Sequence, residues 1–274
     1  MITIKTKEEI DILKEGGKIL AGILDELCAA VKPGITTVDL EEMTRRLMRE
    51  AGGRPAQLDF KMPDKRLFPA ALCVSINSEI VHAPAIPTRV INEGDIVSLD
   101  FVMEYPINEK LRAGRIVNKH SMLGGYYTDM ARTVGAGKIN AEAKNLIKIT
   151  EECLYIGIKQ MKHGGKLSDI GIAIQKHAEA NGYGVVRELV GHGVGYDLHE
   201  EPQVANYRAS SQDIKDVVLK KGMVLAIEPM ITIGDWRIKT KEDGFTFATM
   251  DNSLSAHFEH SVAVTEDGYE ILTQ

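Results

Sequence analysis

Residues 94–101 read GDIVSLDF, and residues 222–229 read GMVLAIEP. Each stretch begins with glycine, continues through five mostly apolar residues and places a carboxylate six positions after the glycine. Apolar, partly β-branched runs of this length are typical of buried strands, where an ionised carboxylate is costly unless it has a partner. The two stretches therefore predict equivalent strands, with Asp100 and Glu228 as counterparts. The alternative is a strand end at which the acid reaches solvent.

Other segments repeat in the same order. TDMARTV at 128–134 corresponds to FEHSVAV at 258–264, and this places Asp129 opposite Glu259. GITTVDL at 34–40 corresponds more loosely to GKLSDI at 165–170. The two acid pairs are separated by nearly the same interval, 128 and 130 residues. A constant interval predicts two similar α+β halves, about 1–139 and 140–274, within one catalytic domain covering 1–274.

Helix signals fall at matching places in the two halves. Thr6 and Glu9 form a capping-box pattern before a long amphipathic stretch that ends at Lys32-Pro33-Gly34. A second helix is expected at about 38–49. In the second half, helices are expected at about 141–161, ending before Gly164-Gly165, and at about 168–181. The chain is therefore expected to have an α/β (α+β) fold.

The composition is that of an ordinary globular enzyme. The chain has 274 residues and a net charge of −6, which gives no electrostatic reason to expect nucleic-acid or membrane binding. Only three cysteines occur, Cys28, Cys73 and Cys153, and their wide spacing fits a reducing compartment. The first ten residues lack the apolar segment of a signal peptide, and no apolar run approaches the roughly 20 residues of a membrane span. We therefore expect a soluble, cytoplasmic protein. We also expect a monomer, although no feature of the sequence determines the oligomeric state.

The paired acids suggest a metal site. Alternate residues of a strand share a face, so Asp100 is expected on the same face as Ser98, and Glu228 on the same face as Ala226. The small residue two positions before each acid leaves room beside the carboxylate. If the halves pack about a pseudo-twofold axis, two acids from each half converge in one cleft. Four ionised carboxylates there would repel one another strongly, and two divalent cations would neutralise them.

Several histidines are placed to complete such a site. His192 lies between glycines in VGHGVG, His82 lies in EIVHAP, His199 begins HEEPQV, and His260 follows Glu259. A single histidine in an apolar context is more often structural, but the glycine bracket lets the backbone at His192 approach a crowded centre. Other motifs are excluded, since residues 199–203 lack the second histidine of HExxH and residues 135–138 form no P-loop.

Five stretches together closely resemble the methionine aminopeptidases: SLDF, YTDMARTVG, GHGVGYDLHEEPQV, AIEPM and FEHSVAVTEDG. The resemblance spans nearly the whole chain and implies the pita-bread fold, a pseudo-twofold antiparallel sheet flanked by two pairs of helices around a dinuclear metal centre. It also implies two divalent ions, Co²⁺, Mn²⁺, Fe²⁺ or Zn²⁺, among which the ligand types do not choose. The implied ligands are Asp100, Asp129, His192, Glu228 and Glu259, of which Asp129 and Glu259 bridge both ions.

The same resemblance implies the reaction. A methionyl aminopeptidase removes the initiator methionine from nascent proteins and peptides, prefers a small second residue, and uses hydroxide generated between the two ions to attack the first peptide carbonyl. Glu228 would shuttle the proton, while His82 and His199 would contact substrate and stabilise the tetrahedral intermediate. Phe68, Cys73 and Phe245 would line an apolar slot for the thioether.

The chain departs from the family pattern in two places. Asp100 and Asp129 are 29 residues apart, because a segment at about 104–123 separates them, as in a bacterial subclass of the family. We expect a solvated surface loop there; the alternative is a contact surface for the ribosome or the substrate. In the pocket, Lys65 stands where an aromatic residue is common and Leu198 replaces a frequent phenylalanine, so the strictness of methionine preference stays open.

The sequence favours one subclass of the family over two alternative classes of protein. No Cys/His extension precedes the catalytic pattern, and only 36 positions separate His192 from Glu228, so we expect a short type I enzyme. An Xaa-Pro peptidase shares the fold and ligands but usually carries a domain ahead of the catalytic one. A non-catalytic binding protein of the same fold typically loses ligands, whereas all five are present here.

Overall fold

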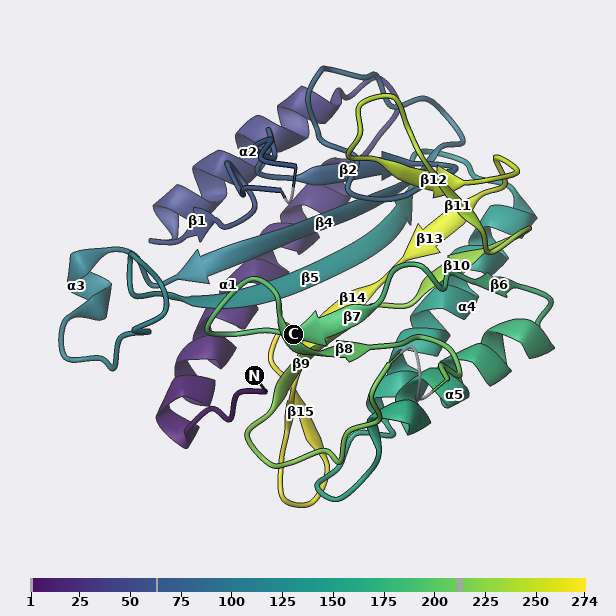
Figure 1. The fold of residues 1–274 in the computed structure, drawn as a ribbon. Helices are drawn as coiled ribbons and strands as arrows, with labels where there is room; N and C mark the ends of the chain where they lie inside the picture. Colours follow the sequence, from purple (N-terminus) through teal and green to yellow (C-terminus); the bar gives the residue numbers. More distant parts are fainter. Residues whose placement is uncertain (1, 63, 211–213) are drawn as a thin grey trace.

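A computed structural model describes residues 2–62, 64–210 and 214–274. Two helices followed by several strands occur twice along the chain, first from α1 and again from α4 (Figure 1). No helix in these ranges is both long enough and apolar enough to cross a membrane. The helices are α1 (Lys7–Ala30), α2 (Thr37–Glu50), α3 (Glu109–Arg112), α4 (Ala141–Ile158) and α5 (Leu167–Ala180).

A nine-stranded antiparallel sheet forms the centre of the molecule. Its strand order is β1 (Arg54–Pro55), β4 (Ile96–Tyr105), β5 (Tyr126–Gly135), β14 (Glu259–Val264), β9 (Val224–Ile227), β7 (Gly191–Gly193) and β8 (Glu200–Val204). Two strands pair off this path, β2 (Cys73–Ile76) with β4 and β15 (Tyr269–Ile271) with β14.

Two three-stranded sheets lie at the margin of the main sheet. One has the order β13 (Ser255–His257), β10 (Met230–Thr232) and β6 (Gly184–Val185). The other has the order β11 (Ile238–Thr240), β12 (Phe247–Thr249) and β3 (Glu79–Val81).

The central order is symmetric about the contact between β5 and β14. On one side lies the antiparallel pair β4–β5, and on the other lies the antiparallel pair β14–β9. Figure 1 shows α1 and α2 along the first pair and α4 and α5 along the second. The predicted α/β fold, an antiparallel sheet flanked by two pairs of helices, is confirmed.

Each strand of the core divides its residues between two faces. Val97, Leu99 and Phe101 of β4 belong to the same buried cluster as Leu20 and Leu24 of α1. Leu225 and Ile227 of β9 are likewise buried with residues of α4 and α5. Because neighbouring residues of a strand point to opposite faces, the alternate residues are left on the side away from the helices.

The predicted helix ends agree closely with the structure. The backbone N–H of Glu9 donates to Thr6 Oγ1 (3.3 Å), and that of Thr6 donates to Glu9 Oε2 (2.8 Å), so the predicted capping box is present. The helix expected at 141–161 ends at Ile158. Beyond it, the N–H of Met161 bonds to the carbonyl of residue 158, a tighter turn that closes the helix early.

The segment 104–123 is only partly the solvated loop that we expected. Its first two residues extend β4, and Glu104 is fully buried, with Arg54 Nη2 2.6 Å from its carboxylate. Asn118 is also buried, and its side-chain amide donates to two backbone carbonyls. Elsewhere in the segment the surface is open, and Met122, four residues after Asn118, is completely exposed. The segment is therefore fixed at Glu104 and at Asn118, because these buried polar groups are paired within the protein.

Candidate metal centre

The sheet register places five predicted ligands on one face. Asp100 pairs with Ala131, and Asp129 pairs with Val102, so the two aspartates are diagonal neighbours on the same side of β4 and β5. Glu259 of β14 also pairs with Ala131 and therefore shares that side. Both His192 and Ser261 pair with Ala226, which puts His192 and Glu228, the residue directly after β9, on this face as well.

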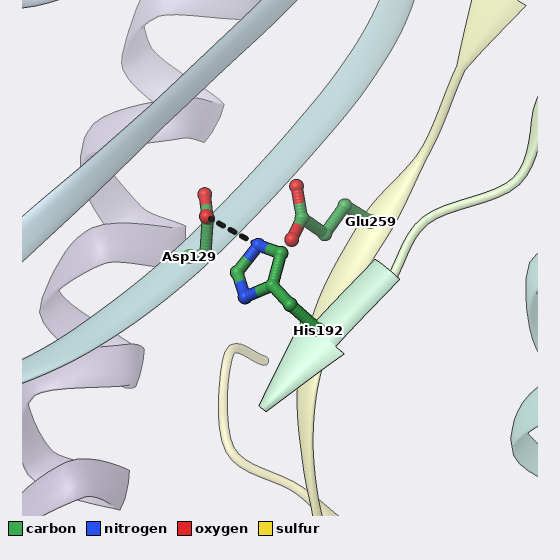
Figure 2. Close-up of side chains that lie close together, drawn as sticks. All are labelled: Asp129, His192 and Glu259. Carbon is green, nitrogen blue, oxygen red and sulfur yellow. Dashed lines mark ion pairs between the residues drawn. The ribbon is translucent and has the colours of Figure 1, made fainter. Parts of the chain in front are cut away.

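The ligand atoms of these residues lie close together. His192 Nε2 is 3.7 Å from Asp129 Oδ2 and 3.5 Å from Glu228 Oε1. Atoms of Asp129, His192 and Glu259 lie within 4.8 Å of one another; Figure 2 shows these side chains converging from β5, β7 and β14. Atoms bound to one ion at about 2.0–2.2 Å lie at most roughly 4.4 Å apart, so the spacing is close to that of a shared cation.

The electrostatics of the cluster also fit a cation. Asp129 Oδ1 and Glu259 Oε1 are buried without a hydrogen-bond partner among the described residues. Burial raises the pKa of Asp100 to about 7. Burial, followed by the charges of neighbouring carboxylates, raises the pKa values of Asp129, Glu228 and Glu259 well above their usual range. Such a cluster is costly as anions alone, and divalent cations would relieve both the burial and the repulsion.

The glycines around His192 are required by close packing. A Cβ at Gly191 would lie 2.4 Å from the carbonyl oxygen of Ala226, and a Cβ at Gly193 would lie 2.4 Å from that of Glu201. Both contacts are with the backbone of neighbouring strands. The glycine bracket therefore allows β7 to enter the sheet at the point where it presents His192 to the acids.

His82 and His199 lie in the same cavity as the acids, which has a volume of about 900 Å³. The ring of His199 stands edge-on to that of His192, with centroids 4.5 Å apart. His82 follows β3 with a φ of +58°, a left-handed conformation that is uncommon for a residue with a side chain. Burial, followed by the charge of His192, lowers the pKa of His82 to about 4 and that of His199 to about 2, so both rings are neutral at pH 7.

The three predicted pocket residues, Phe68, Cys73 and Phe245, also line this cavity. The rings of Phe68 and Phe245 meet edge to face with centroids 5.6 Å apart, and the Cys73 thiol accepts from Gln57 Nε2 at 3.5 Å. Leu198 is a further lining residue, whereas Lys65 is not among the residues that line the cavity.

The segment 104–123 also reaches this cavity. His120 lies in its wall and stacks on the ring of Tyr196, with centroids 5.1 Å apart. The segment thus contributes His120 to the wall of the cavity.

Sequence reasoning missed one residue of the cluster, His257. Its Nε2 lies 3.7 Å from Glu228 Oε2 and 4.0 Å from Glu259 Oε2. Burial lowers its pKa to about 3. The signal that could have found it is its position two residues before Glu259, since residues two apart on an extended chain share a face. His260 instead bonds Thr273 Oγ1 (2.9 Å) and Tyr155 Oη (3.3 Å), away from the acids.

The antiparallel fold and a cavity lined by paired acids and histidines are those of a metallopeptidase. Residues 11–266 match the sequence profile of Metallopeptidase family M24. The chain belongs to that family. Since all five predicted ligands lie between residues 11 and 266, the family match covers the whole candidate centre.

Within the family, the chain groups with the methionine aminopeptidases. It is 40% identical to the methionine aminopeptidase of Clostridium acetobutylicum over 273 residues, which are all of this chain and 99% of the relative. It is also 40% identical to methionine aminopeptidase 1 of Bacillus subtilis over the full length of both chains. The chain also superposes on the crystal structure of methionine aminopeptidase from Thermotoga maritima with a TM-score of 0.87 and 39% identity. The alignment covers 100% of each of the two chains.

Prolidases share the fold. The prolidase of Pyrococcus horikoshii matches with a TM-score of 0.72 at 21% identity, and the match covers 99% of this chain but 63% of the prolidase. At this identity the likeness extends to the fold alone.

Proposed function

We propose that this chain removes methionine from the N-termini of newly made polypeptides in the cytoplasm, preferring a small second residue. The observation that carries the proposal is a single cavity lined by all five predicted metal ligands, by both predicted substrate histidines and by the predicted side-chain pocket. Relatives with this name are 40% identical over the whole chain.

The ligand geometry supports two divalent ions, Co²⁺, Mn²⁺, Fe²⁺ or Zn²⁺. Asp100, Asp129 and Glu259 would hold one ion, and Asp129, His192, Glu228 and Glu259 would hold the other. In support, ligand atoms of Asp129, His192 and Glu259 lie within 4.8 Å of one another, which fits the ion assigned to His192. A second group within the same distance joins Glu259 and Glu228 to His257. The ion assigned to Asp100 is supported by the sheet face that Asp100 shares with Asp129 and Glu259. Both halves of the chain contribute ligands, so we also infer that residues 1–274 act as one catalytic domain.

The chain's own residues account for proton transfer and substrate binding. When bound, the ions lower the pKa of a water molecule from 15.7 towards about 7 and polarise the peptide carbonyl. Glu228 takes one proton from the attacking water and gives it to the amine nitrogen as the C–N bond breaks. The products are free methionine and a peptide with a new amino terminus. His82 and His199, neutral at pH 7, each keep one N–H that can donate to the scissile amide.

The pocket residues favour an unbranched apolar side chain. Phe68 is 6% exposed and Cys73 is 4% exposed, and both present apolar surface to the cavity. Phe245 closes the slot at right angles to Phe68. A thioether is flexible and makes favourable contacts with aromatic ring edges, which suits such a slot.

The proposal is tested by metal removal and by competing peptides. Dialysis against a chelator should abolish cleavage of Met-Ala-Ser, and Mn²⁺ or Co²⁺ should restore it. Glu228→Gln should lose about 10²–10⁴-fold in turnover, because it removes the proton acceptor and weakens a ligand. Glu266→Gln changes an exposed glutamate that pairs with Lys221, and it should leave turnover unchanged.

Two outcomes would contradict the proposal. One is cleavage that persists in rigorously metal-free enzyme. The other is faster cleavage of an Ala-Pro-headed peptide than of Met-Ala-Ser, which would favour the Xaa-Pro peptidase instead. A Leu-Ala-Ser peptide measures how strictly the pocket selects methionine.

A further inference from the structure

His257 is a buried histidine beside the candidate metal centre to which the proposed reaction gives no role. It is 1% exposed, and it is not among the residues that line the cavity. Its Nε2 nevertheless points at two of the acids, with Glu228 Oε2 at 3.7 Å and Glu259 Oε2 at 4.0 Å. The ring therefore approaches the two acids from the buried interior and not from the cavity.

The backbone at His257 is held firmly. It pairs with Met230 in the ladder between β13 and β10. Its N–H donates to Thr133 Oγ1 and its carbonyl accepts from the same hydroxyl, each at 2.8 Å. The Thr133 hydroxyl also lies 2.8 Å from Ser98 Oγ, so residues of both β4 and β5 help to fix the backbone at residue 257. A backbone fixed in this way holds the Cα of His257 at one distance from the acids.

The ring nitrogens of His257 are not satisfied elsewhere. Neither Nδ1 nor Nε2 has a hydrogen-bond partner among the described residues, although both are buried. A neutral imidazole carries one N–H and one lone pair. Within the described ranges, Nε2 is the ring nitrogen that faces carboxylate oxygens, so the proton is best placed on Nε2, where acceptors are within reach after a shift of roughly 0.5 Å.

Glu228 lies between two imidazoles. Its Oε1 is 3.5 Å from Nε2 of His192, which lines the cavity, and its Oε2 is 3.7 Å from Nε2 of His257, which does not. One oxygen thus faces the metal side, and the other faces the protein. Carboxylates that bind metals are commonly held by such a donor on the far side.

We propose that His257 is a positioning residue whose Nε2–H donates a hydrogen bond to Glu228 Oε2 and so directs Glu228 Oε1 towards the metal ions and the attacking water. This inference rests on the proposed function, because that function gives Glu228 its two roles. It assigns His257 no direct contact with ion or substrate.

Two variants separate the possible roles of the ring. His257→Gln keeps an N–H donor but offers no imidazole nitrogen, whereas His257→Leu removes the donor at similar volume. His177→Gln is the control, since His177 lies on α5 and pairs with Glu152 at 2.8 Å. Co²⁺ affinity is measured by equilibrium dialysis, and kcat and KM are measured on Met-Ala-Ser. Urea unfolding of each metal-free variant checks that it is folded.

We expect His257→Leu to lose about 10–100-fold in Co²⁺ affinity and in kcat, with KM little changed. His257→Gln should recover most of both losses, and the control should match the wild type. Equal losses in the Gln and Leu variants would overturn the proposal in favour of direct ligation. Wild-type affinity in the Leu variant would overturn it in favour of plain packing.

A crystal structure of the Co²⁺-loaded wild type gives a check that needs no variant. The proposal expects His257 Nε2 at about 2.7–3.2 Å from Glu228 Oε2. A distance of about 2.1 Å from Nε2 to a metal ion would contradict it. Co²⁺ affinity is measured without turnover, so the failure of this inference and the failure of the proposed function remain distinguishable.

Discussion

Removal of the metal ions should make the stability of this protein fall as the pH rises from about 4 to about 8. The folded protein raises the pKa of Asp100 from its usual 3.8 to about 7 because the carboxyl is buried. A carboxyl with a raised pKa in the folded state contributes stability below its unfolded pKa, and this contribution is lost as the pH rises through the folded pKa. The three acids beside it have pKa values raised in the same direction.

The size of the effect follows from the shift at Asp100. A difference of about three pH units, at 1.36 kcal/mol per unit, corresponds to about 4 kcal/mol of unfolding free energy. Asp100→Asn cannot ionise there and should escape this loss. The free energy of unfolding of the metal-free variant, minus that of the metal-free wild type, should therefore increase by about 4 kcal/mol between pH 4 and pH 8.

Urea unfolding in excess chelator, at intervals of one pH unit, measures this difference directly. Titrations of distant surface carboxylates cancel, because both proteins share them. Metal at about 1,000 times its dissociation constant should return roughly 4 kcal/mol to the wild type at pH 8. Parallel stability curves for wild type and variant across the pH range would refute the reasoning, since they would mean that Asp100 is not held in a desolvated, acid-rich site.

Three further changes have defined outcomes. Gly193→Ala should destabilise the protein by about 1–3 kcal/mol and weaken metal binding, because its Cβ would lie 2.4 Å from a backbone carbonyl and displace His192; urea unfolding and equilibrium dialysis measure both. In α1, Gly17→Ala should destabilise, since its Cβ would lie 2.3 Å from a backbone carbonyl, whereas Gly22→Ala, with no atom within 4 Å, should stabilise by about 0.5–1 kcal/mol in the same urea assay. His199→Ala should lower kcat on Met-Ala-Ser about 10²–10³-fold while Co²⁺ affinity stays near that of the wild type, and unchanged turnover would remove this residue from the reaction.

Much of the site was predictable because its signals are local. Asp100 and Glu228 stand out as acids in apolar strands, and the repeat supplies their partners Asp129 and Glu259. The glycines around His192 signal a close approach of the backbone, and the structure places strand carbonyls where their side chains would be. The first helix begins at the predicted capping box, since capping depends on residues only three positions apart.

Other features depend on which strands pair and in which register. His257 and His260 both lie within two residues of Glu259, and strand alternation favours His257 only if the chain stays extended from residue 257 to residue 259, which the sequence alone does not establish. His260 follows Glu259 on β14 and therefore points to the opposite face, whereas His257 lies on β13 and turns its ring back to Glu228. The conformation of the segment 104–123 also depends on tertiary contacts. Glu104 pairs with Arg54, and the Asn118 amide donates to the carbonyl of Tyr196, and both partners are distant in the sequence.

The sequence by itself thus determined which side chains are available for metal chemistry, and roughly where strands and helices run, because alternation, capping and glycine spacing act over a few residues. Only the tertiary structure decided that the ligands from β4, β5, β7 and β14 share one face with Glu228, the residue after β9, and that His257 lies next to Glu228 and Glu259. The physical reason is that strand register is set by burial of the helix-facing side chains, and a slip of one residue would turn every acid away from the cavity.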